Sequence, residues 1–362
     1  MSHRGRPRHR TTRSSHATRF KCLWWSLTVV LFAVISANAS SQSALDPAGP
    51  QASRIDGLWR LMLYLLSAVF VAVMVVLLVA AFRRRTQVND QPLKPVLLDT
   101  DPGQDRRISR TVISAIALTI VILFVLLVSS FLVGSAINSA PVNDNVLTIE
   151  VTGHQWWWDV RYDNPIPSQM VTTANELHIP VGRPVIFKLI SNDVIHSFWV
   201  PNLHGKTDLV PGHPIETWMQ ADRPGIYRGQ CAEFCGFQHA HMAFAIVAEP
   251  EEQFRAWYAS QLNSAPAPST ESQSRGQQVF LSKPCIMCHR IQGTDAGGRA
   301  GPDLTHVASR QSIGAGTLQN TREHLAGWIL DPQTIKPGNQ MPPNPMSADD
   351  LNALLDYLQS LK

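Results

Sequence analysis

The chain has 362 residues, enough for two or three domains, and 44% of them are hydrophobic. Its formal net charge of +4 is due to residues 1–21, which hold six Arg and one Lys and no acidic residue. The rest of the chain is slightly acidic, so the composition argues against a nucleic-acid-binding protein with a basic surface.

Residues 1–39 are predicted to be a signal peptide. Their basic head runs into an apolar stretch, residues 23–35, which is followed by Ala37-Asn38-Ala39. A short apolar run with an Ala-x-Ala pattern is typical of a secretory signal, here with cleavage after Ala39, and a retained membrane anchor is the alternative. Residues 40–57 would then form a polar extracytoplasmic segment.

Two membrane-spanning helices are predicted, at residues 58–85 and 111–136. Each contains an apolar run long enough to cross a bilayer core of about 30 Å. Basic residues gather at both ends of the loop between them, at Arg83, Arg84, Arg85, Arg106, Arg107 and Arg110. Because basic residues favour the cytoplasmic side, the loop 86–110 is expected inside and the rest of the mature chain outside.

Residues 145–262 are predicted to form a β domain. Its clearest β-rich runs are residues 147–151, 185–190 and 243–247. Short strands separated by Pro and Gly are typical of a β-sandwich or barrel. An amphipathic helix is expected at residues 251–262, followed by a linker at residues 263–275 that is rich in Ser, Pro and Ala.

One short stretch of the β domain contains four candidate metal ligands, namely Cys231, Cys235, His239 and Met242. His196, further upstream, is a second candidate imidazole. Thiolate, imidazole and thioether together are the ligand set of a copper electron-transfer centre, whereas zinc gains little from a thioether. A disulfide is the alternative for the two cysteines, but it would not need the imidazole and thioether beside it. His241 is interpreted as a solvated residue near the site.

Residues 276–362 carry the attachment signal for a c-type haem. The run Cys285-Ile286-Met287-Cys288-His289 matches Cys-x-x-Cys-His, in which two thioether bonds hold the porphyrin and the His ligates the iron. A redox dithiol would not need this His, and no second Cys pair follows for zinc. A low-spin haem needs a second axial ligand, for which Met341 and Met346 are the candidates.

The copper motif closely resembles that of a known family. Cys-x-Glu-x-Cys-Gly-x-x-His-x-x-Met, preceded by Asp-x-x-His-Ser-Phe, is similar to the dinuclear CuA site in subunit II of haem–copper cytochrome c oxidases. The resemblance implies a cupredoxin fold, which is a Greek-key barrel, and two thiolates that bridge two coppers. The implied ligands are His196, Cys231, Cys235, His239, Met242 and the backbone carbonyl of Glu233.

The resemblance also assigns roles to two residues around the copper. The Glu233 side chain would ligate a magnesium ion at the border with subunit I. Trp156, in Gly153-His154-Gln155-Trp156-Trp157-Trp158, would be the point of electron input from a c-type haem. Packing in the domain core is the alternative for these tryptophans, Trp157 above all.

The haem segment resembles a class I cytochrome c. Met341 lies in the context Lys-Pro-Gly-x-x-Met-Pro of that family, which favours it over Met346 as the axial ligand. Gly301-Pro302-Asp303-Leu304 is similar to the family's haem-packing loop. Residues 347–361 are expected to form a C-terminal helix with Ser347 as its N-cap.

The resemblance over residues 42–362 is therefore to subunit II of a caa-type cytochrome c oxidase. It implies a multidomain chain: a two-helix transmembrane hairpin, an all-β cupredoxin domain and an all-α class I cytochrome c domain. The chain would lie in a bacterial plasma membrane with its redox domains outside. Electrons would pass from an external c-type cytochrome through haem c and CuA to the haem and CuB of subunit I, where oxygen is reduced and protons are translocated.

Subunit III is a further expected partner. Two alternative functions would share most of these sequence features. A nitric-oxide reductase with a CuA subunit would keep the copper ligands, and a membrane-tethered electron carrier would have no oxidase partner. A quinol oxidase subunit II would lack the copper ligands.

One departure from the family is that residues 107–112 contain no acid, although many subunit II chains carry a Glu there at the mouth of a proton path.

Overall fold

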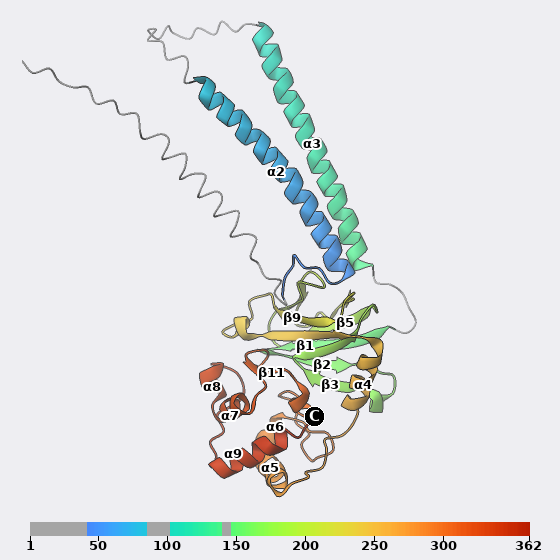
Figure 1. The fold of residues 1–362 in the computed structure, drawn as a ribbon, viewed down its shortest axis with the longest axis vertical. Helices are drawn as coiled ribbons and strands as arrows, with labels where there is room; N and C mark the ends of the chain where they lie inside the picture. The colour runs from blue at the N-terminus through green and yellow to red at the C-terminus, as the bar shows by residue number, and fades with distance from the viewer. Residues whose placement is uncertain (1–41, 85–101, 140–145) are drawn as a thin grey trace, which may run out of the picture. The chain divides into compact units, whose positions relative to one another are not determined.

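The computed structural model describes residues 42–84, 102–139 and 146–362 of the chain (Figure 1). The predicted signal peptide, residues 1–39, lies outside these residues. So does most of the loop that was expected at residues 86–110.

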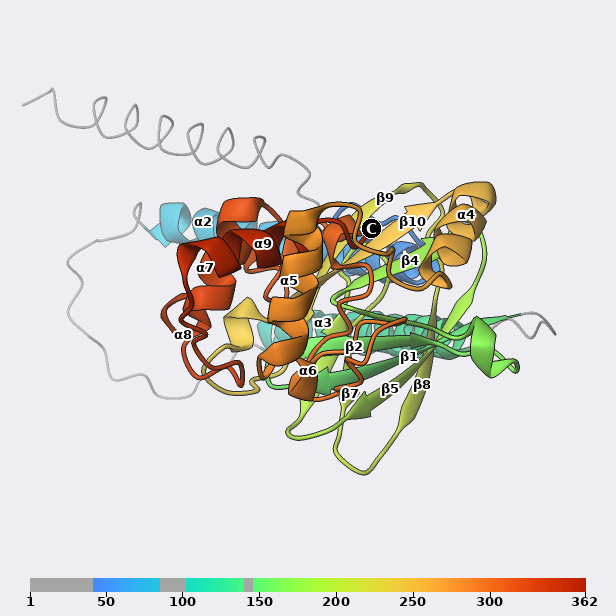
Figure 2. The same cartoon turned by 90° about the horizontal axis from the view of Figure 1, so that it is seen from below.

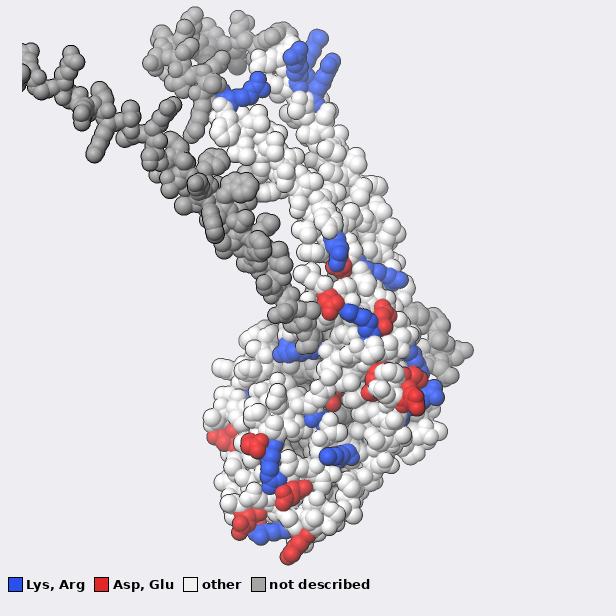
Figure 3. Space-filling view, viewed as in Figure 1, with Lys and Arg blue, Asp and Glu red and all other residues white. Residues whose placement is uncertain are grey.

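Two long helices, α2 (Pro50–Arg84) and α3 (Pro102–Asn138), correspond to the predicted membrane hairpin. Both contain a window of mean hydropathy 3.0, long and apolar enough to cross a membrane. Charged side chains lie toward their ends, and the surface between is uncharged (Figure 3). Both helices begin before the predicted membrane spans, 58–85 and 111–136, because an apolar run marks the membrane part of a helix and not its polar extension.

The β domain consists of two five-stranded sheets. The first has the order β3 (Val171–Ala174), β2 (Trp157–Tyr162), β1 (Leu147–His154), β5 (Val185–Ser191) and β8 (Ile215–Met219). The second has the order β4 (Glu176–Pro180), β10 (Ala243–Glu249), β9 (Gly225–Cys231), β6 (His196–Trp199) and β7 (Thr207–Leu209). The pairs β1–β5 and β4–β10 are parallel and the other neighbours are antiparallel.

Alternation of apolar and polar residues places the β-domain core between these sheets. In β5, Val185, Phe187 and Leu189 are completely buried, while the residues between them are partly exposed. Burial of such side chains stabilises the fold by about 1.5–3 kcal/mol each. Trp158 lies at the centre, with ring centroids 5.7 Å from Phe198 and 5.3 Å from Phe244. The predicted all-β domain is confirmed.

Short helical elements complete the β domain: η1 (Pro167–Gln169), η2 (His239–His241) and α4 (Glu251–Gln261). The predicted helix at residues 251–262 is thus present. Trp257 of α4 stacks on His178 with centroids 4.1 Å apart and planes 5° from parallel. Phe254 is buried against the same core, so α4 closes one edge of the domain.

The C-terminal module is mainly helical (Figure 2). It comprises α5 (Glu271–Ser282), α6 (Cys285–Cys288), η3 (Val307–Ser309), β11 (Ser312–Ile313), β12 (Leu318–Gln319), α7 (Arg322–Leu330), α8 (Pro332–Ile335) and α9 (Ala348–Leu358). As predicted, Ser347 caps α9 by accepting a hydrogen bond from the Asp350 amide, 3.1 Å away.

The predicted linker, residues 263–275, was too long by its last residues. Helix α5 begins at Glu271, and the Thr270 hydroxyl accepts a hydrogen bond from the Gln273 amide. Thr followed by Glu is a helix-start signal that the Ser- and Pro-rich composition obscured. Val279 and Phe280 of α5 then enter a core that is separate from that of the β domain.

Candidate metal centres

Strand pairing brings the candidate copper ligands together. Cys231 ends β9, and Cys235, His239 and Met242 lie in the connection from β9 to β10. His196 begins β6, which pairs with β9 on its other side. The distant imidazole and the four-residue cluster therefore meet at one end of the second sheet.

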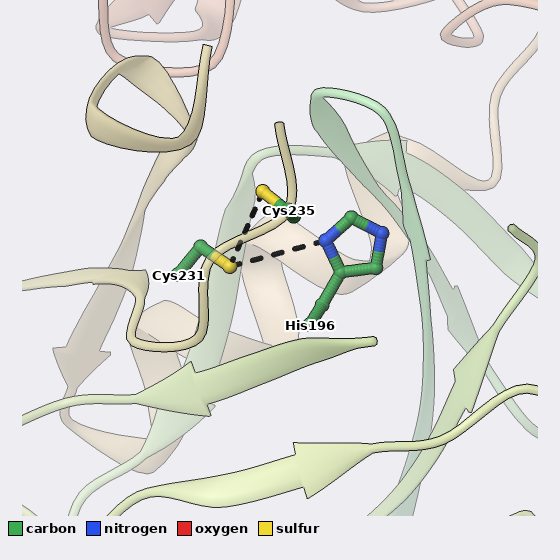
Figure 4. Close-up of side chains that lie close together, drawn as sticks. All are labelled: His196, Cys231 and Cys235. Atoms are coloured by element: carbon green, nitrogen blue, oxygen red, sulfur yellow. Dashed lines mark hydrogen bonds between the residues drawn. The ribbon is translucent and has the colours of Figure 1, made fainter. Parts of the chain in front are cut away.

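Three of these residues form the inner part of the site (Figure 4). The Sγ atoms of Cys231 and Cys235 are 3.7 Å apart, and Cys231 Sγ lies 3.9 Å from His196 Nδ1. All three side chains are buried. Both cysteines are free, so the disulfide considered as an alternative is not formed.

The remaining predicted ligands surround this group. Cys235 Sγ is 3.6 Å from His239 Nδ1 and 3.8 Å from Met242 Sδ. The Glu233 carbonyl oxygen lies 3.1 Å from Cys231 Sγ. His241 is exposed, and its Nδ1 lies 2.8 Å from Gln238 Oε1, as expected for a residue outside the cluster.

Close packing fixes the orientation of the His196 ring. Its Nε2 lies 2.7 Å from Asp193 Oδ1, which leaves Nδ1 facing the sulfurs. A Cβ atom at Gly153 would lie 2.9 Å from the ring, so this position requires glycine. Burial alone would lower the pKa of His196, but hydrogen bonds with Cys231 and Asp193 outweigh it and raise the pKa.

The electrostatics of the two thiols favour a cation between them. Hydrogen bonding to Cys235 lowers the pKa of Cys231 to about 3, and the pKa of Cys235 is raised in turn. Without a metal ion the buried pair therefore shares one proton, because two adjacent thiolates repel each other. Bound cations deprotonate coordinating thiols, and the thioether of Met242 is a soft ligand that suits copper. The donor set fits a copper centre.

The haem motif lines a cavity of about 400 Å³, whose wall belongs mostly to the C-terminal module and in part to the β domain. The candidate haem residues on its wall are Cys285, Cys288, His289 and Met341. Much of the remaining wall is apolar, and includes Phe280, Leu304, Val307, Ile329 and Leu354. Met346 is absent from this lining and is a partly buried residue that packs against the hydrophobic core of the module.

His289 is oriented for ligation by its surroundings. Its Nδ1 donates a hydrogen bond to the Pro302 carbonyl at 2.8 Å, so that Nε2 remains free. A Cβ at Gly301 would lie 2.8 Å from the ring, which explains a glycine beside the predicted haem-packing loop. Burial lowers the pKa of His289 and favours the neutral form that binds iron.

Arg310 provides a further test of the fit to haem. It is half-buried and lines the cavity. Its Nη2 donates to the Asp303 carbonyl, whereas its buried Nε has no hydrogen-bond partner among the described residues. Leaving such a donor unpaired costs about 1–3 kcal/mol or more. A haem carries carboxylates that could accept this bond, so the cavity fits the cofactor. No sequence motif marks Arg310 as a functional residue.

The three consecutive tryptophans occupy different environments. Trp156 is 8% exposed and lies in the turn between β1 and β2. Its Nε1 donates to the Cys235 carbonyl at 2.8 Å, and the residue also lines the haem cavity. Trp157 lines the same cavity and stacks on His154, whereas Trp158 is a core residue. Trp156 therefore touches both candidate centres.

Two family models match the chain. "Cytochrome C oxidase subunit II, periplasmic domain" covers residues 147–249, and "Cytochrome c" covers residues 273–362. A solved structure of the periplasmic domain of cytochrome oxidase subunit II from Bradyrhizobium japonicum is 32% identical, covering 34% of this chain and 96% of its own. Its TM-score of 0.31 is too low to support an argument about the fold.

Curated relatives extend the similarity to almost the whole chain. The "Cytochrome c oxidase subunit 2" of Alkalihalophilus pseudofirmus is 38% identical over 325 residues, which are 88% of this chain and 91% of the relative. That of Bacillus sp. is 33% identical over 63% of this chain and 65% of the relative. Because the relative from Alkalihalophilus pseudofirmus is matched along most of both chains, the chain belongs to the cytochrome c oxidase subunit 2 family.

Proposed function

We propose that the chain is the electron-input subunit of a haem–copper terminal oxidase. When bound, haem c and CuA each supply a one-electron redox step. Electrons pass from the C-terminal module to the copper loop, which comprises residues 231–242, and then to subunit I, where oxygen is reduced to water with proton translocation. The redox domains lie outside the plasma membrane, to which α2 and α3 anchor them.

The position of Trp156 is the observation that carries this proposal. One end of its indole is hydrogen-bonded to the carbonyl of Cys235, and the residue forms part of the haem cavity. A single side chain thus spans the interval between two candidate redox centres. We assign it the role of electron input to the copper loop.

The geometry around each centre supports the ligands that we propose. Cys285 and Cys288 would attach the haem, and His289 and Met341 would ligate its iron, since all four line the cavity. The copper ligands are His196, Cys231, Cys235, His239, Met242 and the carbonyl of Glu233. Asp193 holds the first imidazole in place, since it bonds the ring nitrogen that faces away from the sulfurs.

The remaining assignments extend the same proposal. We propose an external c-type cytochrome as donor and subunit III as an additional partner. A magnesium ion on the Glu233 carboxylate would have to displace Lys206, whose Nζ lies 3.0 Å from it. No feature of the described residues favours a nitric-oxide reductase or an isolated carrier.

The test is to purify the full-length chain from membranes in mild detergent. We expect two coppers and one covalent haem per chain, an EPR signal from one electron shared by two coppers, and co-purification of a large haem-containing subunit. One copper or none beside an intact haem would refute the copper assignment. Isolation without a large subunit would indicate the tethered carrier instead.

Trp156→Ala sharpens the test, with Trp257→Ala as the matched control. After rapid reduction of the haem, the first variant should transfer electrons to copper more slowly while both cofactors stay bound. Trp257 lies on α4, away from both centres, and its loss should leave the rate unchanged. An unaltered transfer rate in Trp156→Ala would show that Trp156 serves only in packing.

A further inference from the structure

Lys336 is a buried lysine at the contact between the two redox domains. It is 2% exposed, although lysine is almost never fully buried without partners. Its Nζ donates to the carbonyls of Trp156 at 2.7 Å, His241 at 2.7 Å and Gly314 at 2.9 Å. The first two acceptors belong to the β domain, and the third lies in the turn between β11 and β12.

The bonding of this ammonium group is complete. A lysine has three N–H donors, and each meets one carbonyl. Burial lowers the pKa of Lys336 to about 7, because the charged form loses its hydration. Such a cost is offset only when every donor is satisfied, so a displaced domain would leave a buried charge with missing partners. The contact therefore favours one arrangement of the two domains.

Neighbouring contacts fix the same segment. The Gln238 side chain in the copper loop donates to the Pro337 carbonyl at 2.8 Å. The amide of Ala243, which follows the copper loop, donates to the Ala315 carbonyl at 3.0 Å. Both ends of the copper-loop segment from Gln238 to Ala243 are thus bonded to the haem module.

Lys336 also leads directly into the candidate haem ligand. Only four residues separate it from Met341, and the intervening Gly338 lies close to the Trp156 ring, with a Cβ there 3.6 Å away. A displacement of Lys336 would therefore move the Met341 segment relative to the indole. Separation matters because electron transfer slows steeply as the gap between centres widens.

On the basis of the proposed function, we propose that Lys336 is a positioning residue, which holds the haem module against Trp156 and the copper loop by binding carbonyls of both domains. The electron transferred from ferrous haem reduces copper and leaves ferric haem, and Lys336 takes no part in that exchange. Its contribution is to fix the distance over which the exchange occurs.

The test compares Lys336→Met with Lys362→Met in the full-length chain, isolated with its partner subunits. Methionine keeps the apolar stem and removes the three donors, and Lys362 is an exposed lysine of the same module. Hydrogen exchange reports the contact through the amides of Ala243 and Gln311, which bond across it. We expect both amides to exchange at least about tenfold faster in Lys336→Met, and transfer from haem to copper to slow similarly.

Several controls separate positioning from a general loss of structure. Amides of α9, the haem potential and the copper EPR signal should be unchanged in Lys336→Met. Faster exchange throughout α9 would show local unfolding and overturn the inference, as would unchanged exchange at Ala243 and Gln311. Wild-type protein that binds both cofactors but transfers no electron between them would instead refute the proposed function.

A second variant perturbs the contact from the β domain. The Gln311 amide donates to Glu176 Oε2 at 3.0 Å, and Glu176 is distant in sequence from every candidate ligand. Glu176→Gln should also speed the exchange of these amides, by a smaller factor than Lys336→Met. It leaves the Met341 segment unchanged. If the Ala243 amide exchanges at the wild-type rate in both variants, the proposal is wrong. Glu176→Gln keeps the proposal testable if Lys336→Met folds poorly.

Discussion

The copper loop and the haem cavity hold similar ligands in different ways. In the copper loop the side chains of Cys231, Cys235 and Met242 already contact one another and are buried. In the haem module, His289 and Met341 face a cavity of about 400 Å³. The first site is a finished part of a packed domain, and the second is a space that the polypeptide alone does not fill.

This difference determines what each cofactor contributes to stability. Apolar side chains line much of this cavity, and each Å² of their surface gains about 25 cal/mol when a bound group removes it from water. The haem therefore belongs to the core of its module, whereas copper is added to a scaffold whose ten strands are packed without it.

The largest effect should follow loss of haem attachment. In Cys285→Ala with Cys288→Ala, we expect the haem module to lose its folded state, because its helices would surround an unfilled cavity. The β domain should stay folded, since its core is separate. Comparing hydrogen exchange in α5 and α9 with that in β1 and β5 would show whether the haem module unfolds while the β domain stays folded. Native protection of α5 and α9 without haem would contradict the comparison.

The matched experiment removes the copper thiols. Cys231→Ser with Cys235→Ser should abolish copper binding and leave the melting temperature of the β domain within a few degrees of the wild-type value. The substitution is nearly isosteric, and no cavity results from it. Unfolding of the β domain in this variant would mean that copper, like haem, is part of a core.

The next largest effect is expected at Trp158, whose side chain is completely buried beside His196, with ring centroids 5.9 Å apart. Trp158→Ala should destabilise the β domain by about 3–5 kcal/mol and weaken copper binding, because the imidazole loses its support. Chemical denaturation and copper titration would measure these effects. The partly exposed Trp257 on α4 is the control, and its truncation should cost less and spare copper.

A smaller, pH-dependent effect is expected at Asp159 of β2. Burial, together with the charge of Asp303, raises the pKa of Asp159 to about 6, against the opposing effects of a backbone hydrogen bond and Arg161. The folded-state pKa exceeds the usual value of an aspartate. Between about pH 4 and 6 the folded chain therefore holds a proton at Asp159 that the unfolded chain has released. Stability should therefore fall as pH rises through this window.

Asp159→Asn should remove that pH dependence. At pH 8 we expect it to stabilise the chain by at most about 3 kcal/mol, and at pH 4 to have little effect. Thermal unfolding at several pH values would test this. Equal effects at both pH values would show that the environment does not raise the pKa of Asp159.

Most of the fold was accessible from sequence because its signals are local. The spacing of Cys231, Cys235, His239 and Met242 is a property of one loop, and the haem attachment motif is five residues long. Strand alternation and apolar runs likewise depend on nearby residues. The ends of α2 and α3 were misjudged, since polar residues continue a helix without an apolar signal.

Long-range contacts could not be predicted in the same way. Lys336 is ordinary in sequence, and only the fold brings three carbonyls from separate segments to its Nζ. Arg310 has no motif, and its role depends on the cavity that it lines. Trp156 was singled out by resemblance, whereas its bond to Cys235 depends on the meeting of a turn and a loop.

The smallest effect on stability should come from Met341→Leu, which tests the haem side of the comparison most directly. A volume-conserving change on the cavity wall should cost less than about 1.5 kcal/mol and leave the haem attached through its thioethers. Loss of the thioether ligand should nevertheless lower the haem potential and alter the spectrum, because Met ligation raises the potential. Met346→Leu, at a partly buried position against the hydrophobic core of the module, should change neither property. A redox titration of both variants would decide between them, and an unchanged potential in Met341→Leu would transfer the ligand to Met346.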